Sequence, residues 1–260
     1  MKMMKYAVLA LAIAGILSGC TVHIDASGFD NCRFQEERSA TIPVDGAKTL
    51  QVMARAGSLR VEGHPGLTEV QVKGTACAST EGLLRDVDLR AEKAGDVVRV
   101  EARIPTVVGN SPTLDLTVEV PEAMLARVED SSGDLEIQNT AGADVTDESG
   151  EIDLYDIAGP IRVDDQSGDI LIRNAKSDLV IYRDQSGSIR IDGVKGNVTV
   201  DRDESGDIDI ATVSGNVMIE EDQSGNIDVR EVTGDFTVRQ DGSGEITYSK
   251  VNGRVSIPRR

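Results

Sequence analysis

The sequence predicts an all-β protein: a single-stranded parallel β-helix, or β-solenoid, with rungs of about 19 residues and an irregular β cap at its N-terminal end. Three observations support this prediction. A Ser-Gly pair recurs at a near-constant interval, apolar and polar residues alternate after each pair, and glycine recurs at a second position. A period of this length indicates a repeat architecture. The serines of the seven pairs are Ser132, Ser149, Ser167, Ser186, Ser205, Ser224 and Ser243.

Each repeat begins with a short predicted strand. The second and fourth residues after the glycine of the pair are apolar, which is strand spacing, and most are β-branched. A helical solenoid is excluded because the repeats lack apolar residues at helical spacing, and a propeller blade would need about 40 residues. The second positions are Leu135, Ile152, Ile170, Ile189, Ile208, Ile227 and Ile246, and the fourth are Ile137, Leu154, Ile172, Ile191, Ile210, Val229 and Tyr248.

A second predicted strand closes each coil, as at Val198 and Val200. In the later repeats a glycine precedes this strand, and we expect positive φ there because glycine adopts it without a Cβ penalty. Coils stacked at roughly 4.8 Å pair each strand with its neighbours above and below. The sequence therefore predicts a regular solenoid of seven rungs over residues 130–260. The glycines in question are Gly196, Gly215, Gly234 and Gly253.

Residues 48–129 lack the strict period but alternate like strands. We expect an irregular β part that is continuous with the stack and caps it, because an uncapped rung invites further pairing. The expected strands are Leu50–Ala54, Ser58–Glu62, Glu69–Lys73, Val87–Ala91, Val97–Ile104 and Leu114–Val120.

The N-terminus predicts export. Lys2 and Lys5 precede an apolar run, residues 6–17, that is too short to span a bilayer, so residues 1–19 are predicted to be a signal peptide. The run ends in Leu-Ser-Gly-Cys20, which resembles the bacterial lipobox. This resemblance implies cleavage before Cys20 and a diacylglycerol on its sulfur; the alternative is an ordinary secretory cleavage with a free Cys20.

Residues 20–47 are then a lipid anchor followed by a tether or cap. Thr21 in place of aspartate resembles the enterobacterial sorting signal for the outer membrane, and the side of the membrane is left open. Two or more acyl chains make a stable anchor.

Two further cysteines, Cys32 and Cys77, would lie in an oxidising compartment. We expect them to form one disulfide, and the alternative is a pair of unpaired buried thiols. Their spacing matches no metal motif.

The chain resembles a bacterial exported β-strand-repeat family of unknown function that is named for adhesion. The resemblance rests on Leu50–Gly63 with its Gly-Ser-Leu-Arg-Val-Glu-Gly run, on Val118–Pro121, on Ser132–Asp134 and on the repeats that follow, and it covers roughly residues 40–257. It implies a parallel β-solenoid attached to the cell envelope, and it implies no catalytic residue.

An aspartate precedes every Ser-Gly pair, and in a solenoid these residues form one column. Carboxylates about 4.8 Å apart repel by roughly 1 kcal/mol in water, so a divalent cation such as Ca²⁺ is one hypothesis. The favoured interpretation is an Asx-turn at each corner, with the carboxylates in solvent and no cofactor. The column is Asp130, Asp147, Asp165, Asp184, Asp203, Asp222 and Asp241, and the last five are the candidate metal ligands. A second acidic column comprises Asp134, Glu151, Asp169, Asp207 and Glu245.

The sequence predicts no enzyme activity, because the carboxylates recur in every repeat, aromatic residues make up 3% of the chain and tryptophan is absent. His23 and His64 are expected on the surface, while Leu171, Val180 and Tyr182 should face outward from the core. Without residues 1–19 the chain carries 25 basic and 45 acidic residues, a net charge of −20, which disfavours nucleic-acid binding.

These observations favour a monomeric, lipid-anchored envelope solenoid with a non-enzymatic, adhesin-like role in binding or structure. It would reach the membrane through Cys20 and bind an unknown protein or glycan partner. The first alternative is a calcium-stabilised acidic solenoid, and the second is a polysaccharide-active β-helix enzyme.

Overall fold

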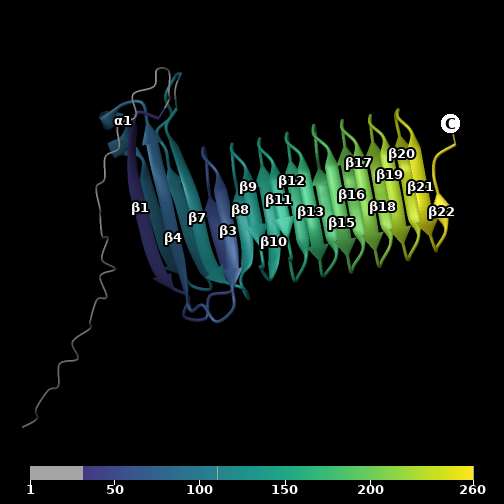
Figure 1. Ribbon diagram of the computed structural model, residues 1–260, viewed down its shortest axis with the longest axis horizontal. Coiled ribbons are helices and arrows are strands. Elements are labelled where there is room, and N and C mark those ends of the chain that lie inside the picture. Colours follow the sequence, from purple (N-terminus) through teal and green to yellow (C-terminus); the bar gives the residue numbers. More distant parts are fainter. Residues whose placement is uncertain (1–31, 110, 260) are drawn as a thin grey trace, which may run out of the picture.

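The computed structural model describes residues 32–109 and 111–259. These residues form an elongated stack of strands that is broad at the N-terminal end and regular toward the C-terminal end (Figure 1). The strands make two 11-stranded sheets with the apolar core between them.

Sheet A runs from the N-terminal end of the stack to its C-terminal end. Its order is β1 (Phe34–Pro43), β4 (Glu69–Ala78), β7 (Thr113–Pro121), β3 (Leu59–His64), β9 (Leu135–Gln138), β11 (Ile152–Tyr155), β13 (Ile170–Ala175), β15 (Ile189–Val194), β17 (Ile208–Val213), β19 (Ile227–Val232) and β21 (Ile246–Val251).

Sheet B lies opposite sheet A. In the same direction its order is β5 (Asp88–Ala94), β6 (Val97–Arg103), β2 (Thr49–Met53), β8 (Leu125–Glu129), β10 (Gly142–Asp147), β12 (Ile161–Asp165), β14 (Leu179–Arg183), β16 (Val198–Asp203), β18 (Val217–Asp222), β20 (Phe236–Asp241) and β22 (Val255–Ser256).

The seven predicted rungs run from β9–β10 to β21–β22, and every strand in them pairs in parallel with its neighbours. Equivalent residues stack in register, as Ile189, Ile208 and Ile227 do. From β9 to β19 the two apolar positions of the first strand are at most 1% exposed. The prediction of a parallel β-solenoid with rungs of about 19 residues is confirmed.

The last rung closes the stack differently. Tyr248 stays in register with the fully buried Val229 but is 49% exposed, and Ile257 is 37% exposed. These exposures place both side chains at the open end of the described stack.

The repeat becomes longer by one residue between β12 and β14, and this change has a local cause. Asp164 on β12 pairs with Arg183 on β14, whereas Val163 pairs with Ile181, so the register shifts by one residue. Tyr182 is the extra residue, and the later rungs keep this extra position. The insertion lengthens the strand end while the aspartate stays in its column.

Glycine is required at two corners for different reasons. At the Ser-Gly corner Gly168 has φ +145°, and a Cβ there would overlap the carbonyl oxygen of Gly150 on the rung before. The expectation of positive φ at the second corner is wrong: Gly215 avoids the left-handed region, and a Cβ on it would lie 2.5 Å from the Gly196 oxygen. Close approach of the backbones requires glycine there.

The left-handed residue lies near the end of the first strand instead. One residue per rung adopts φ between +54° and +80° at this position, and only one of them is glycine. They are Asn139, Asp156, Asn174, Gly193, Thr212, Glu231 and Lys250.

The N-terminal part builds coils out of sequence order. β2 pairs with both β6 and β8, and β3 pairs with both β7 and β9. The earliest coil, β2–β3, is therefore inserted between two later ones. All six strands expected here are present with shifted ends, whereas β1, β8 and the helix α1 (Glu81–Asp86) were not predicted. β1, β4 and β7 pair antiparallel, as do β5 and β6.

Candidate functional site

The aspartate that precedes each Ser-Gly pair lies at the end of a strand of sheet B or just beyond it, and points into the stack. Asp147 pairs in register with Asp165, and Asp203 with Asp222. Six side chains of this aspartate column are at most 4% exposed, and the seventh, Asp241, is half-buried. The expectation that the carboxylates fan into solvent is wrong, because at these tight corners the backbone covers them and they lie in the interior. The six are Asp130, Asp147, Asp165, Asp184, Asp203 and Asp222.

Local hydrogen bonds of the expected Asx type occur at two corners. Asp130 Oδ1 accepts from the Ser131 N–H at 2.8 Å, and Asp184 Oδ1 accepts from the Ser186 N–H at 3.1 Å. At four other corners neither carboxyl oxygen makes a hydrogen bond of standard geometry with a described residue, although neighbouring backbone N–H groups or a facing carboxyl lie close enough to act on its charge. These are the corners of Asp147, Asp165, Asp203 and Asp222.

Burial dominates the electrostatics of the column. Desolvation raises the pKa of Asp130, Asp165 and Asp184 to about 7 and that of Asp147 to about 6, and nearby carboxylates add to each shift. Backbone N–H groups, such as those of Gln166 and Ser167 beside Asp165, lower the pKa by less.

Asp203 and Asp222 titrate as a pair on adjacent rungs. Burial and their contact raise the pKa of Asp203 well above its usual range, and burial also raises that of Asp222. Both shifts favour the protonated form of these carboxyls.

Metal ligation was the other hypothesis for this column. Within residues 32–109 and 111–259, no three or more His, Cys, Asp or Glu side chains are placed to hold one metal ion. The five candidate ligands lie in single file along the stack, not around a common centre.

The second acidic column has a structural role at the surface. Asp169 Oδ1 accepts from the Ser188 N–H at 2.8 Å, and Asp207 Oδ1 accepts from the Asn226 N–H at 2.9 Å. The opposite corner repeats this arrangement, with Asn197 Oδ1 accepting from the Asn216 N–H at 2.9 Å. These side chains join each rung to the next, and the recurring Asp or Asn is the sequence signal for them.

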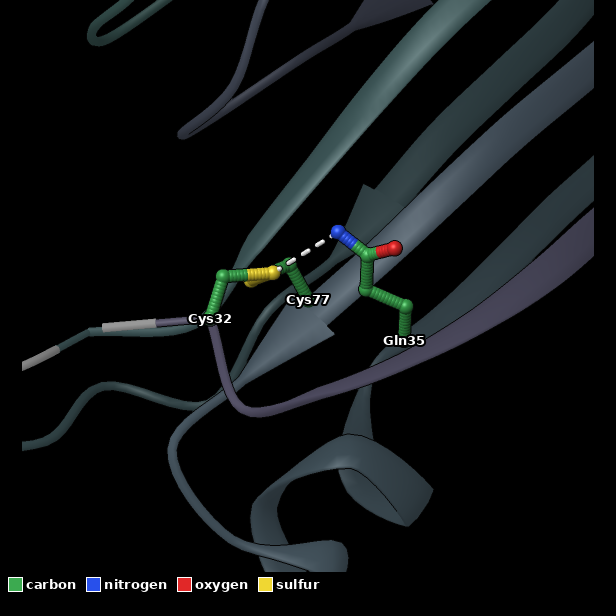
Figure 2. Close-up of a disulfide and its surroundings, with 3 residues drawn as sticks. All are labelled: Cys32, Gln35 and Cys77. Carbon is green, nitrogen blue, oxygen red and sulfur yellow. Dashed lines mark hydrogen bonds between the residues drawn. A yellow bond between two sulfur atoms is a disulfide. The ribbon is translucent and has the colours of Figure 1, made fainter. Parts of the chain in front are cut away.

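Cys32 and Cys77 are joined by a disulfide with a Cα–Cα distance of 5.2 Å (Figure 2). The bond ties Cys32, two residues before β1, to the C-terminal end of β4. Gln35 Nε2 donates to the Cys32 sulfur at 3.1 Å. Cys20, the predicted signal peptide and His23 lie outside the described residues.

His64 is half-buried at the end of β3, with its Nε2 3.9 Å from Glu62 Oε1. It lies apart from the aspartate column, which is built from sheet B.

The outer face of sheet B carries an uncharged stripe that sequence reasoning found only in part. One register row runs through Val180, Thr199, Met218 and Thr237, and Tyr182 beside it is 46% exposed. We call these five residues the sheet B stripe. The equivalent row on sheet A is mostly charged: Glu136, Asp153, Leu171, Arg190, Asp209 and Asp228.

A groove of about 550 Å³ lies over β2, β5 and β6 at the N-terminal end. Its charges oppose each other across the strand pair, where Asp88 faces Arg103, and Arg103 also contacts Glu101 at 3.1 Å. Acidic and basic groups alternate along the groove, so it does not select a ligand of one charge.

The stacked rungs and the single-file column define a parallel β-solenoid repeat protein. The chain belongs to the Toastrack DUF4097 family, whose model matches residues 27–193. No curated protein matches. No helix among the described residues is long and apolar enough to cross a membrane.

Several solved structures are similar to this chain. A "putative adhesin" from Bacteroides fragilis is 13% identical, with 86% of this chain and 97% of that one covered and a TM-score of 0.46. A "putative cell adhesion protein" from Clostridium sporogenes is 11% identical, with 86% and 100% covered and a TM-score of 0.34. A "putative lipid binding protein" from Parabacteroides distasonis is 14% identical, with 86% and 97% covered and a TM-score of 0.37.

Proposed function

We propose that this protein is a monomeric, non-enzymatic, lipid-anchored solenoid of the cell envelope, attached to the outer membrane through Cys20, that binds a protein or glycan partner. The sheet B stripe is the observation that carries the binding role. Four consecutive rungs present uncharged side chains there, on a chain with a net charge of −18.

The stripe suits a flat partner. Val180 and Met218 offer apolar surface, Thr199 and Thr237 offer hydroxyl groups, and Tyr182 offers an aromatic ring with a polar end. Charged groups such as Arg183 and Arg202 flank it and are already paired, with Asp164 and Glu221 respectively. The partner would therefore be recognised by uncharged contacts.

Photo-crosslinking in intact cells tests the binding role. A photo-reactive residue at Met218 should give a discrete adduct, and one at Asp228 on the exposed face of sheet A should not. Mass spectrometry of the adduct then separates a protein from a glycan partner. Equal crosslinking from both faces would count against the stripe.

A Cys20→Ser variant tests the anchor. It should move from the membrane fraction to the soluble fraction and lose metabolic labelling by a fatty acid, because lipidation requires the sulfur. A variant that stays membrane-bound and labelled would contradict lipid attachment at Cys20.

The non-enzymatic role is supported by the burial of the aspartate column, since the carboxyl groups are at most 4% exposed in six rungs and cannot meet a polymer substrate. A screen against envelope polysaccharides should show no depolymerisation. Hydrolysis or elimination that disappears in an Asp184→Asn variant would overturn this view.

A further inference from the structure

A row of buried carboxyl groups runs along the solenoid without the partners that buried charges need. Asp147, Asp165, Asp203 and Asp222 are at most 1% exposed, and neither oxygen of any of them makes a hydrogen bond of standard geometry with a described residue. The backbone N–H groups nearby offset less of the cost than burial imposes. An ionised carboxylate in such a place is so costly that buried groups become neutral instead. The column therefore needs a base, a cation or a proton on each rung.

Basic side chains do not supply this neutralisation. The neighbours in sequence, Arg183 and Arg202, point outward and pair with Asp164 at 2.8 Å and with Glu221 at 3.0 Å. Apart from the column itself, the charged groups that act on it are acidic, from its own strands and turns and from the segment that leads into β13. They are Glu148, Asp164, Asp169 and Glu204.

The described residues do not build a metal centre of three or more such ligands either. Each rung contributes one buried carboxyl, and the described residues include no set of three or more acidic, histidine or cysteine groups around one point. The column members face one another in register on adjacent rungs, as Asp147 faces Asp165 and Asp203 faces Asp222.

We propose that the aspartate column takes up protons as the chain folds, and that this row of shared protons is a pH-sensitive lock on the stacking of the rungs. A protonated carboxyl has one O–H donor, so each acid can donate to an oxygen of the next rung. Loss of a proton leaves two buried carboxylates face to face, which weakens the contact between those two rungs.

The direction of the pH effect follows from the buried carboxyls. In the folded chain the pKa of Asp130, Asp165 and Asp184 is about 7 and that of Asp147 about 6, against 3.8 for an unperturbed aspartate. A raised folded pKa contributes stability that is full below pH about 4 and is lost as the pH rises through the folded values. The stability that the column contributes is thus lost between pH about 4 and about 7, and the Asp203–Asp222 pair extends this range to higher pH.

Thermal unfolding across pH tests the lock on the full mature chain. The wild-type Tm should fall as the pH rises from 5 to 8. Asp203→Asn and Asp184→Asn replace an acid by a neutral amide of the same shape, so each variant should flatten the Tm profile and match or exceed the wild type at pH 8. Asp192→Asn, which removes an exposed carboxyl on sheet A, should leave the profile unchanged.

Two further measurements use only the wild type and therefore test the proposal even if an asparagine variant fails to fold. Infrared spectra of the wild type at pH 6 should show the C=O stretch of protonated carboxyl groups in the folded state, and it should vanish on unfolding. Ca²⁺ and a chelator should leave the wild-type Tm unchanged at pH 8.

A wild-type Tm that is flat or rises from pH 5 to 8 would overturn the proposal. So would the absence of protonated carboxyls at pH 6. A large rise in Tm with Ca²⁺ that is lost in Asp203→Asn would replace the proton lock with a cation site.

Discussion

Gly187 packs on Gly168 so closely that a methyl group on the first would overlap the carbonyl oxygen of the second. The contact repeats at every Ser-Gly corner from Gly133 to Gly244 and sets how near the rungs approach there. The glycine of the Ser-Gly pair is thus required by backbone packing, because the backbones of adjacent rungs are in contact at this corner.

Gly187→Ala should be among the most destabilising substitutions in this chain. The residue has φ +137°, which is nearly exclusive to glycine, and the added Cβ collides with backbone that cannot move alone. We expect a loss of about 3 kcal/mol or more in urea unfolding. Gly82→Ala is the matched control, because its Cβ meets nothing nearer than 3.9 Å in α1, and it should gain up to about 1 kcal/mol. Equal effects at the two sites would refute the crowding argument.

Thr212→Gly should stabilise the protein. Thr212 is β-branched and has φ +58°, at the rung position where Gly193 occurs one repeat earlier. Left-handed backbone costs an L-residue roughly 1–2 kcal/mol, so the free energy of unfolding should rise by about 1 kcal/mol. Thr199→Gly in the extended β16 should instead lower it. A loss at both positions would show that the Thr212 side chain contributes more than the strain costs.

Reduction of the Cys32–Cys77 disulfide should loosen the N-terminal cap. The bond closes a loop with a sequence separation of 45 residues, and its loss should cost about 2–4 kcal/mol. The check is chemical unfolding with and without reductant. A Cys32→Ser/Cys77→Ser double variant should be as stable as the reduced wild type, with or without reductant. If reductant still lowered the stability of this variant, the effect could not be assigned to the Cys32–Cys77 disulfide.

Deletion of one complete rung should leave a shorter folded protein. Removing residues 189–207 joins Ser188 to Ile208 and preserves every column, because the two rungs share one register. Removing residues 189–206 takes out one residue fewer and puts Asp207 at the position of the buried Ile208, beside the crowded Ser-Gly corner, so that strand loses its register with the rung before it. We expect a cooperative thermal transition for the first deletion and a grossly lowered Tm for the second. Similar transitions for both would mean that the columns do not set the register.

The regular rungs were predictable because each repeats a local pattern that stacks on its own copy. The position of the Ser-Gly corner, the aliphatic columns and the strand pairs all follow from the period. The burial of Asp184 was not predictable, because sequence patterns place charged residues outside, and only the closed corner shows that its carboxyl faces inward.

In the N-terminal part, β1 and the order of the coils could not be predicted, for a different reason. β1 contains Glu36, Glu37 and Arg38 in succession and lies at a sheet edge, so it has little apolar alternation to reveal it. The insertion of β2–β3 between later coils depends on contacts between residues far apart in the sequence, such as Met53 with Glu129. No local pattern encodes such a pairing.

That insertion also sets an order of assembly. The β2–β3 coil is synthesised early, yet its two neighbours are complete only when the chain as far as Gln138 is available. The cap therefore closes through distant contacts, which makes this step slow relative to local folding. Each later rung contacts only its neighbours, so the rest of the chain can fold by adding one rung after another onto the completed cap.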